Sequence, residues 1–175
     1  RLTLVSMPWA IFNRPSIQLG ALKSYICTHA PEIDVVACHP YLDAAKKISL
    51  DAYRLISEDS WAGEAIYCAL LFPEIREQAK NVYYSSLGKK KTGKLPGFNL
   101  LCEKLDNQLD SWLTEHDFST TDLVGFSVCF AQLPASLLAA KRLKNKNPHI
   151  KVVFGGSTCV PKIGTSLLQV FKDLD

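Results

Sequence analysis

The sequence predicts an α/β fold in which a parallel β-sheet carries helices on both faces. The chain opens with a strand–helix–strand pattern over residues 2–37 and closes with a second such pattern over residues 123–171. Right-handed crossovers turn repeats of this kind into a parallel sheet. A long stretch with mainly helical periodicity, at about residues 43–120, separates the two units. It predicts a helical insertion between the second and third strands.

The first unit begins with the apolar, β-branched run 2–6, which is typical of a buried strand. A loop over residues 7–14 follows, and Pro15 stands where a helix can begin without losing a hydrogen bond. Residues 33–37 form the second expected strand. The helix between the strands carries apolar residues at amphipathic spacing, at Ile17, Ala21, Leu22, Tyr25 and Ile26.

The insertion predicts helices on either side of a basic tract. Residues 42–67 are helical in pattern and offer large side chains for packing, namely Tyr53, Leu55, Ile56, Trp61 and Ile66. Residues 100–112 predict a further helix with one apolar stripe, formed by Leu101, Leu105, Leu109 and Trp112. The tract 89–94 between them predicts a solvated loop, with an electrostatic contact to an acidic partner peptide as the alternative.

The closing unit repeats the pattern of the first. Strands are expected at residues 123–128 and 151–154, and helices at residues 133–146 and 163–171. Together the two units predict a Rossmann-like (flavodoxin-like) sheet.

Composition excludes several classes of protein. The 175 residues are 47% hydrophobic and 21% charged, as in one globular domain with an ample core. A net charge of +3 is too small to predict a nucleic-acid or membrane surface. No apolar run approaches the roughly 18–20 residues that span a bilayer, and no signal peptide is recognisable. We therefore expect a cytoplasmic protein.

The cysteines and histidines do not predict a metal site. The six cysteines are scattered, without a CxxC pair, and their neighbours are mostly apolar. Structural zinc sites and redox dithiols have closely spaced ligands in the sequence, so the pattern favours reduced, packed thiols. The four histidines are equally scattered.

The ends of three strands predict a ligand site. In open α/β sheets, ligands bind outside the carboxyl ends of the strands, where the strand order reverses. Three loops converge at that edge. They contribute the candidate binding residues Ser6, Met7, Pro8, Trp9, Ser127, Val128, Cys129, Phe130, Gln132, Gly155, Gly156, Ser157 and Thr158. The adjacent glycines permit close backbone approach, and the two hydroxyls after them suit a phosphate group.

Common nucleotide-binding and hydrolase motifs are missing. No GxGxxG follows the first strand, so the dinucleotide fingerprint is absent, and no GxxxxGK[ST] is present. No GxSxG elbow follows a strand either.

Five segments, taken in order and with their spacing, resemble one known family. These segments are Val5-Ser6-Met7-Pro8-Trp9, residues 13–23 (NRPSIQLGALK), Gly63-Glu64-Ala65, residues 125–130 (GFSVCF) and residues 152–158 (VVFGGST). They resemble the N-terminal half of the radical S-adenosylmethionine (SAM) proteins called RiPP, or bacteriocin, maturation radical SAM protein 1. The resemblance covers essentially the whole chain.

The resemblance implies a cobalamin-binding domain that is followed by a radical SAM domain. In such enzymes the second domain holds a [4Fe–4S] cluster on CxxxCxxC and binds SAM, and methylcobalamin donates a methyl group to a carbon radical on the substrate. The implied substrate is a ribosomally synthesised precursor peptide. CxxxCxxC does not occur here. We therefore expect this chain to be the cofactor half of a larger methyltransferase, with a fifth strand and the radical SAM domain beyond Asp175.

The resemblance also implies roles for single residues. Ser127 resembles the serine that holds the nucleotide tail of cobalamin. Gly155 and Gly156 resemble the glycine pair that lets this tail slide between sheet and helix, with Gly20, Ala21, Ser157 and Thr158 as the small residues of the slot. The candidates beneath the corrin ring are Val128, Cys129, Phe130 and Gln132. Trp9 is a candidate for stacking on the ring, and the insertion is expected to cover it.

The sequence departs from the motif that many cobalamin domains share. Many cobalamin domains carry DxHxxG after the first strand, and its histidine binds the cobalt. Residues 6–12 contain neither the aspartate nor the histidine, which implies a cobalt without a histidine below it.

The alternative function is a cofactor-free module for peptide or protein interaction. A response regulator and a flavodoxin fit less well, because Ser6, Met7, Pro8 and Trp9 provide neither an acidic pair nor a phosphate loop.

Overall fold

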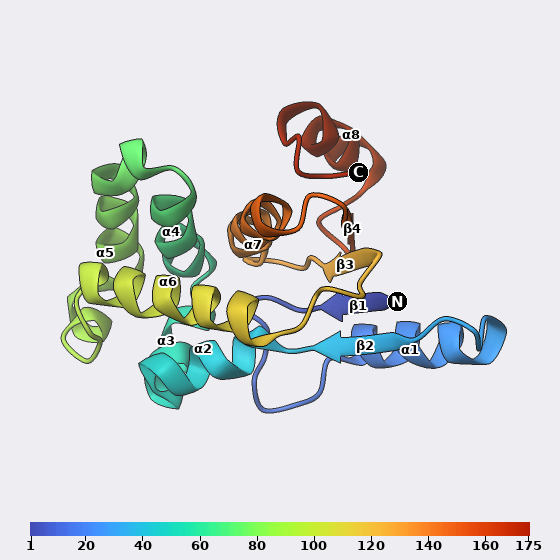
Figure 1. The fold of residues 1–175 in the computed structure, drawn as a ribbon. Coiled ribbons are helices and arrows are strands. Elements are labelled where there is room, and N and C mark those ends of the chain that lie inside the picture. Colours follow the sequence, from blue (N-terminus) through green and yellow to red (C-terminus); the bar gives the residue numbers. More distant parts are fainter.

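The computed structural model describes residues 1–88 and 91–175 and confirms the α/β fold class. Its strands are β1 (Leu2–Val5), β2 (Val35–Cys38), β3 (Leu123–Ser127) and β4 (Lys151–Gly155). They form one parallel sheet in the order β2-β1-β3-β4 (Figure 1). The predicted strand positions are correct to within two residues at each end.

The two faces of the sheet are covered by different helices. Helix α1 (Ile17–His29) leads from β1 to β2 and packs over these two strands, through a small cluster of Leu4, Leu19 and Val35. Helix α7 (Leu133–Lys146) leads from β3 to β4 on the opposite face. There, Val124, Phe126 and Val152 join the main hydrophobic core. Helix α8 (Pro161–Val170) follows β4.

Helices fill the chain between β2 and β3. They are α2 (Pro40–Ile48), α3 (Leu50–Ser57), α4 (Ser60–Leu71), the 3₁₀ turn η1 (Pro73–Ile75), α5 (Arg76–Thr92) and α6 (Phe98–Glu115). Helix α4 packs against both α5 and α7, and α2 packs against α6. The main core is therefore continuous from the α7 face of the sheet into this helical layer.

The helical segment predicted at residues 42–67 is broken at two capping residues. The hydroxyl of Ser49 accepts a hydrogen bond from the Ala52 amide (3.3 Å), and the Asp59 carboxylate accepts one from the Ala62 amide (3.1 Å). Each side chain caps the helix that follows it, which explains why the chain restarts there. Trp61, a predicted packing residue, is 70% exposed because it lies in the first turn of α4, on the outer surface.

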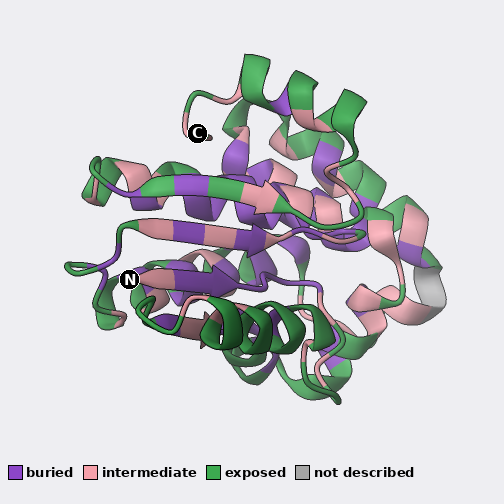
Figure 2. Ribbon diagram, turned by 90° about the vertical axis from the view of Figure 1, so that its right-hand side faces the viewer, coloured by how far each residue is buried: buried purple, intermediate pink, exposed green. Residues whose placement is uncertain are grey.

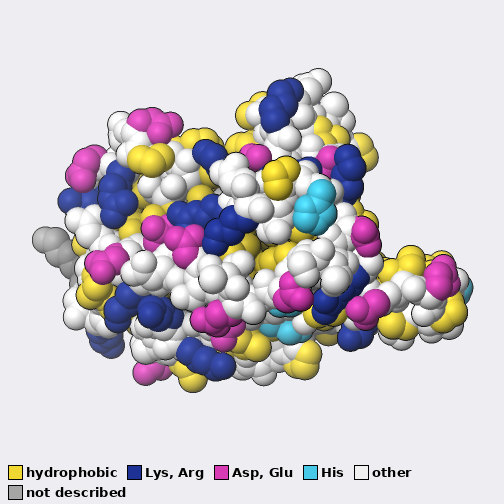
Figure 3. All heavy atoms as spheres, in the orientation of Figure 1, with side chains coloured by type: hydrophobic (Ala, Val, Ile, Leu, Met, Phe, Trp, Pro, Cys, Tyr) yellow, Lys and Arg dark blue, Asp and Glu magenta, His cyan; other side chains and the backbone are white. Residues whose placement is uncertain are grey.

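The basic tract at residues 89–94, predicted as a loop, overlaps the end of α5. The backbone of α5 is interrupted at Gly88 (φ 67°, ψ 164°), and turns at Lys94 and Leu95 follow its last residue, Thr92. Lys89 and Lys90 lie outside the described residues. Positive and negative side chains are interspersed over the face shown in Figure 3, in line with the small net charge.

Of the apolar stripe predicted for α1, Ile26 packs against the cluster of Leu4, Leu19 and Val35, whereas most of the stripe does not pack on the sheet. Leu19 is the buried residue of this helix, whereas Ile17 is 76% and Tyr25 63% exposed. Figure 2 shows α1 as a mostly exposed helix in front of the sheet. The physical reason is that α1 packs mainly on β1 and β2, and does so through few residues. Its other apolar residues therefore face solvent or the strands that the helix does not cover.

Two glycine-to-alanine variants test the packing of the helical layer. A Cβ at Gly63 would lie 2.5 Å from Cδ1 of Trp9, whereas a Cβ at Gly20 would meet nothing within 4 Å. Alanine is favoured over glycine in a helix by about 1 kcal/mol, so Gly20→Ala should raise the free energy of unfolding by about that amount. Gly63→Ala should lower it by about 1–2 kcal/mol, because the overpacking cost exceeds the helical gain. Urea denaturation measures the free energy of unfolding of both variants. Equal changes in the two variants would contradict the close packing of Gly63 on Trp9.

Candidate ligand-binding site at the carboxyl edge

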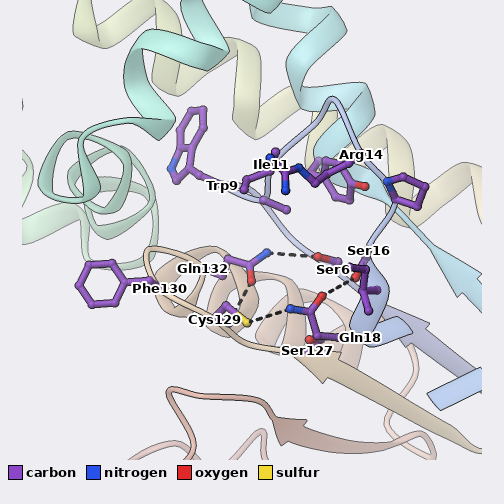
Figure 4. A pocket seen from close by; sticks show the side chains of 14 residues that line it. Ser6, Trp9, Ile11, Arg14, Ser16, Gln18, Ser127, Cys129, Phe130 and Gln132 are labelled. Atoms are coloured by element: carbon purple, nitrogen blue, oxygen red, sulfur yellow. Dashed lines mark hydrogen bonds between the residues drawn. The ribbon is translucent and has the colours of Figure 1, made fainter. Parts of the chain in front are cut away.

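A cleft of about 390 Å³ opens at the carboxyl ends of β1 and β3. The chain leaves β1 toward β2 on one side and leaves β3 toward β4 on the other, so this is the topological switch point of the sheet. The cleft is drawn in Figure 4. Its lining residues are Ser6, Trp9, Ala10, Ile11, Arg14, Pro15, Ser16, Ile17, Gln18, Tyr41, Ser127, Cys129, Phe130 and Gln132.

A buried glutamine joins the two loops that form this cleft. The Gln132 amide nitrogen donates to Oγ of Ser6 (3.2 Å) and to the carbonyl of Met7. Its amide oxygen accepts from the backbone N–H of Cys129 (2.9 Å). Gln132 is only 3% exposed, and the two bonds that it donates are buried. One side chain thus fixes the loop after β1 against the loop after β3.

The first turn of α1 forms another wall of the cleft. Ser16 caps the helix by accepting from the Leu19 amide (3.4 Å) and donates its own hydroxyl hydrogen to Oε1 of Gln18 (3.2 Å). The Gln18 amide nitrogen approaches Sγ of Cys129 at 4.0 Å. No acidic residue lies in this first turn. Arg14 is the charged side chain among the described lining residues, so the cleft has a positive potential at this wall.

A second cavity, an apolar groove of about 550 Å³, lies on the α1 face of the sheet. Its described lining consists of Leu2, Leu4, Gln18, Leu19, Ala21, Leu22, Leu123, Gly125, Phe126, Ser127, Val153, Phe154, Gly155 and Gly156. The groove follows β3 and β4, the half of this face that α1 leaves uncovered. It shares Gln18 and Ser127 with the cleft. Cleft and groove therefore lie next to each other at the ends of the strands, with Gln18 and Ser127 bordering both.

The two adjacent glycines have different functions in this surface. Gly156 has φ +107°, and a Cβ there would lie 2.6 Å from the Val128 carbonyl oxygen. The Val128 amide donates to the Gly155 carbonyl (2.6 Å), and the Thr158 amide donates to the Val128 carbonyl (3.2 Å). Gly156 is thus required by a tight backbone crossing. A Cβ at Gly155 would meet nothing within 4 Å, so that position leaves open space in the groove.

Several predicted site residues are buried structural residues. Met7 is 1% exposed, Pro8 is buried, and Val128 is fully buried. Trp9 borders the cleft but is 5% exposed, because its ring packs on Tyr53 at a centroid distance of 4.9 Å and on the backbone of Gly63. The burial of Met7, Pro8 and Trp9 holds the loop after β1 in place, and that of Val128 holds the loop after β3.

Other predicted residues lie at the rim or away from both cavities. Ser127, Cys129 and Gln132 line the cleft as expected, and Phe130 stands at its rim with 79% exposure. Ser157 is exposed and Thr158 is half-buried, and neither lines the cleft or the groove.

The residues that precede and open α1 also belong to the site, although they were not predicted from the sequence. Arg14, Ser16 and Gln18 line the cleft, as does Ile11 from the loop before them. The signal was available in the run Asn13-Arg14-Pro15-Ser16, where an N-cap residue and a proline at a helix start mark a helix terminus directed at the sheet edge.

The described lining of the cleft is suited to binding rather than to acid–base chemistry. It contains no carboxylate and no histidine, and no group of described residues is arranged to hold a metal ion. Burial raises the pKa of the Tyr41 phenol, which therefore remains a neutral donor at pH 7.

Comparisons with known proteins identify no relative: no family model, no curated protein and no solved structure matches the chain. Among the helices of the described residues, none has the length and hydropathy needed to cross a membrane.

A pair of glutamine variants tests the bridge across the cleft. Gln132→Met keeps the side-chain length but leaves the Cys129 amide and the Met7 carbonyl without their partner. We expect it to lower the free energy of unfolding by about 1–3 kcal/mol, the cost of unpaired buried polar groups. The matched variant Gln18→Met changes an exposed amide and should shift stability by no more than about 0.5 kcal/mol. Equal urea midpoints for the two variants would contradict a structural role for Gln132.

Proposed function

We propose that this chain is the cobalamin-binding domain of a radical SAM enzyme that C-methylates a ribosomally synthesised precursor peptide. The observation that carries the proposal is the pair of adjacent cavities at the switch point, the cleft at the strand ends and the groove along β3 and β4, which share Gln18 and Ser127. A ligand with a broad ring system and a long tail requires a site of this shape: an open cleft at the strand ends and a slot beside the sheet.

The residues of the slot fit a tail of this kind. Gly125 and Gly155 both lie on the groove side, and the open space at Gly155 is not used by any side chain of this protein. The walls are apolar, with Leu4 and Val153 among them, and Ser127 supplies a hydroxyl where groove and cleft meet. In this proposal the tail of cobalamin takes the groove, and Ser127 and Gln18 bind it at the junction.

The cleft would receive the corrin ring. When bound, methylcobalamin supplies the methyl group, while SAM and the [4Fe–4S] cluster belong to the downstream radical SAM domain of the parent enzyme. Ser6, Gln132 and Cys129 would contact the ring, and the exposed apolar side chains of Ile11 and Ile17 would be available to pack on it. No described lining residue is a histidine, so a cobalt bound in this cleft would have no imidazole ligand from the lining. The proposed compartment is the cytoplasm.

A second candidate function is a cofactor-free module for peptide or protein interaction. The observation that favours it is the exposure of large apolar side chains at and near the cleft. Ile17 and Phe130 line the cleft, and Tyr25 is exposed further along α1. Exposed apolar side chains that gather on one surface mark interaction sites.

An anaerobic titration with hydroxocobalamin, read by visible absorbance, tests the cobalamin proposal. It is made with this chain and with a version extended past Asp175. Gly155→Leu should weaken binding at least roughly tenfold, or about 1.4 kcal/mol, because the leucine side chain fills the groove. The variant should fold normally, since a Cβ at this position meets nothing. Gly97→Leu is the matched control, because Gly97 also has open space but lies at the start of α6.

The outcomes separate the two candidate functions. Binding by either version, with weakening by Gly155→Leu and not by Gly97→Leu, supports cobalamin in the groove. Binding that Gly155→Leu leaves intact would overturn the assignment of the groove. If neither version binds hydroxocobalamin, the cofactor function is wrong and the interaction module becomes the better account.

A further inference from the structure

Two cysteines that are 30 positions apart in the sequence are brought together at the carboxyl edge of the sheet. Cys129 follows β3 and Cys159 follows β4. The residues just before them, Val128 and Thr158, are joined by a backbone hydrogen bond of 3.2 Å. The tight crossing of Gly156 over the Val128 backbone keeps the two loops in contact. The next residue of each loop therefore starts from adjacent backbone positions.

The environment of the two thiols supports this proximity. Both cysteines are free and half-buried. Burial raises the pKa of the Cys159 thiol, and a negative charge on Cys129 raises it further, so the sulfur atoms lie within electrostatic reach of each other. Cys129 also lines the cleft, whereas Cys159 packs against the main core. A soluble reagent thus reaches Cys129 first.

The other described thiols have different surroundings. Cys38 and Cys102 are buried, and burial raises the pKa of each to about 11, which keeps them protonated and unreactive at neutral pH. Cys68 is half-buried in α4, and burial raises its pKa to about 11 as well. Cys27 is exposed on α1.

We propose that Cys129 and Cys159 form a dithiol that closes to a disulfide at the edge of the cleft when a low-molecular-weight disulfide is present. The Cys129 thiolate attacks glutathione disulfide, which forms a mixed disulfide and releases one glutathione thiolate. Cys159 then attacks the Cys129 sulfur and releases the second glutathione. One S–S bond breaks and one forms, glutathione disulfide is reduced to two glutathione thiols, and these take the two protons of the cysteines.

The closed form changes the cleft that the ligand would use. Cys129 is both a lining residue and the partner of the Gln18 amide at 4.0 Å. Drawing its sulfur toward Cys159 removes this contact and ties the loop after β3 to the loop after β4. The dithiol is therefore a modification site that acts on the cleft directly, and it does not depend on which ligand the cleft binds.

The experiment is oxidation of the native protein with a small excess of glutathione disulfide, followed by acid quenching and intact mass measurement. We expect the loss of two hydrogen atoms and of two of the six titratable thiols. Peptide mapping without reductant should recover Cys129 joined to Cys159. Cys129→Ser should take up no glutathione at this edge, and Cys159→Ser should stop at a stable mixed disulfide on Cys129.

Cys27→Ser is the matched control, because it removes an exposed thiol from α1 and should leave the oxidation pattern of the other two unchanged. Circular dichroism of each serine variant checks that it folds. The proposal is overturned if the wild-type protein accumulates a mixed disulfide at Cys129 without closing, or if the mapped disulfide joins another pair of cysteines.

Discussion

The buried amide of Gln132 is the interaction on which the site depends. The pairing of β1 with β3 ends at Val5 and Phe126, and beyond these residues the two chain segments turn in opposite directions. Beyond that point Gln132 links the two segments, with two donated bonds to the loop after β1 and one accepted from the loop after β3. Because all three partners are fixed by one rigid amide, the cleft between the loops is preformed and need not be organised by a ligand.

The two faces of the sheet contribute unequally to the hydrophobic core, and the groove lies on the face that contributes less. The face toward α7 is continuous with the helical layer and holds the main core. The opposite face has a small cluster in which Leu19 is the buried contribution of α1. Parallel sheets are normally covered on both faces. Here the stability comes mainly from one face, and the uncovered part of the other, beside Gly125 and Gly155, is free to accept a ligand.

The sequence predicted the sheet well because its strands are short apolar runs set between periodic helices, and these signals are local. The site was predicted less completely. Trp9 and Val128 follow strand ends, which favours a binding role, but each is buried by a partner far along the chain: Gly63 for Trp9, and the Gly155–Thr158 loop for Val128. Such long-range contacts leave no local signal. Arg14 and Gln18 were missed for a different reason. The residue pattern around them is local, but it is fully explained as the start of a helix and so does not indicate a binding role.

The chemistry of the cleft follows from these constraints. Its described lining is uncharged apart from Arg14, so it provides shape, hydrogen bonds and a weak positive potential, without a carboxylate or a histidine. A site of this composition suits a ligand that brings its own reactivity, since the protein then contributes position and exclusion of water. The backbone crossing at Gly156 also positions groups at this edge of the sheet. It joins the loops after β3 and β4 through backbone contacts, so the side chains of Cys129 and Cys159 remain free to react with each other.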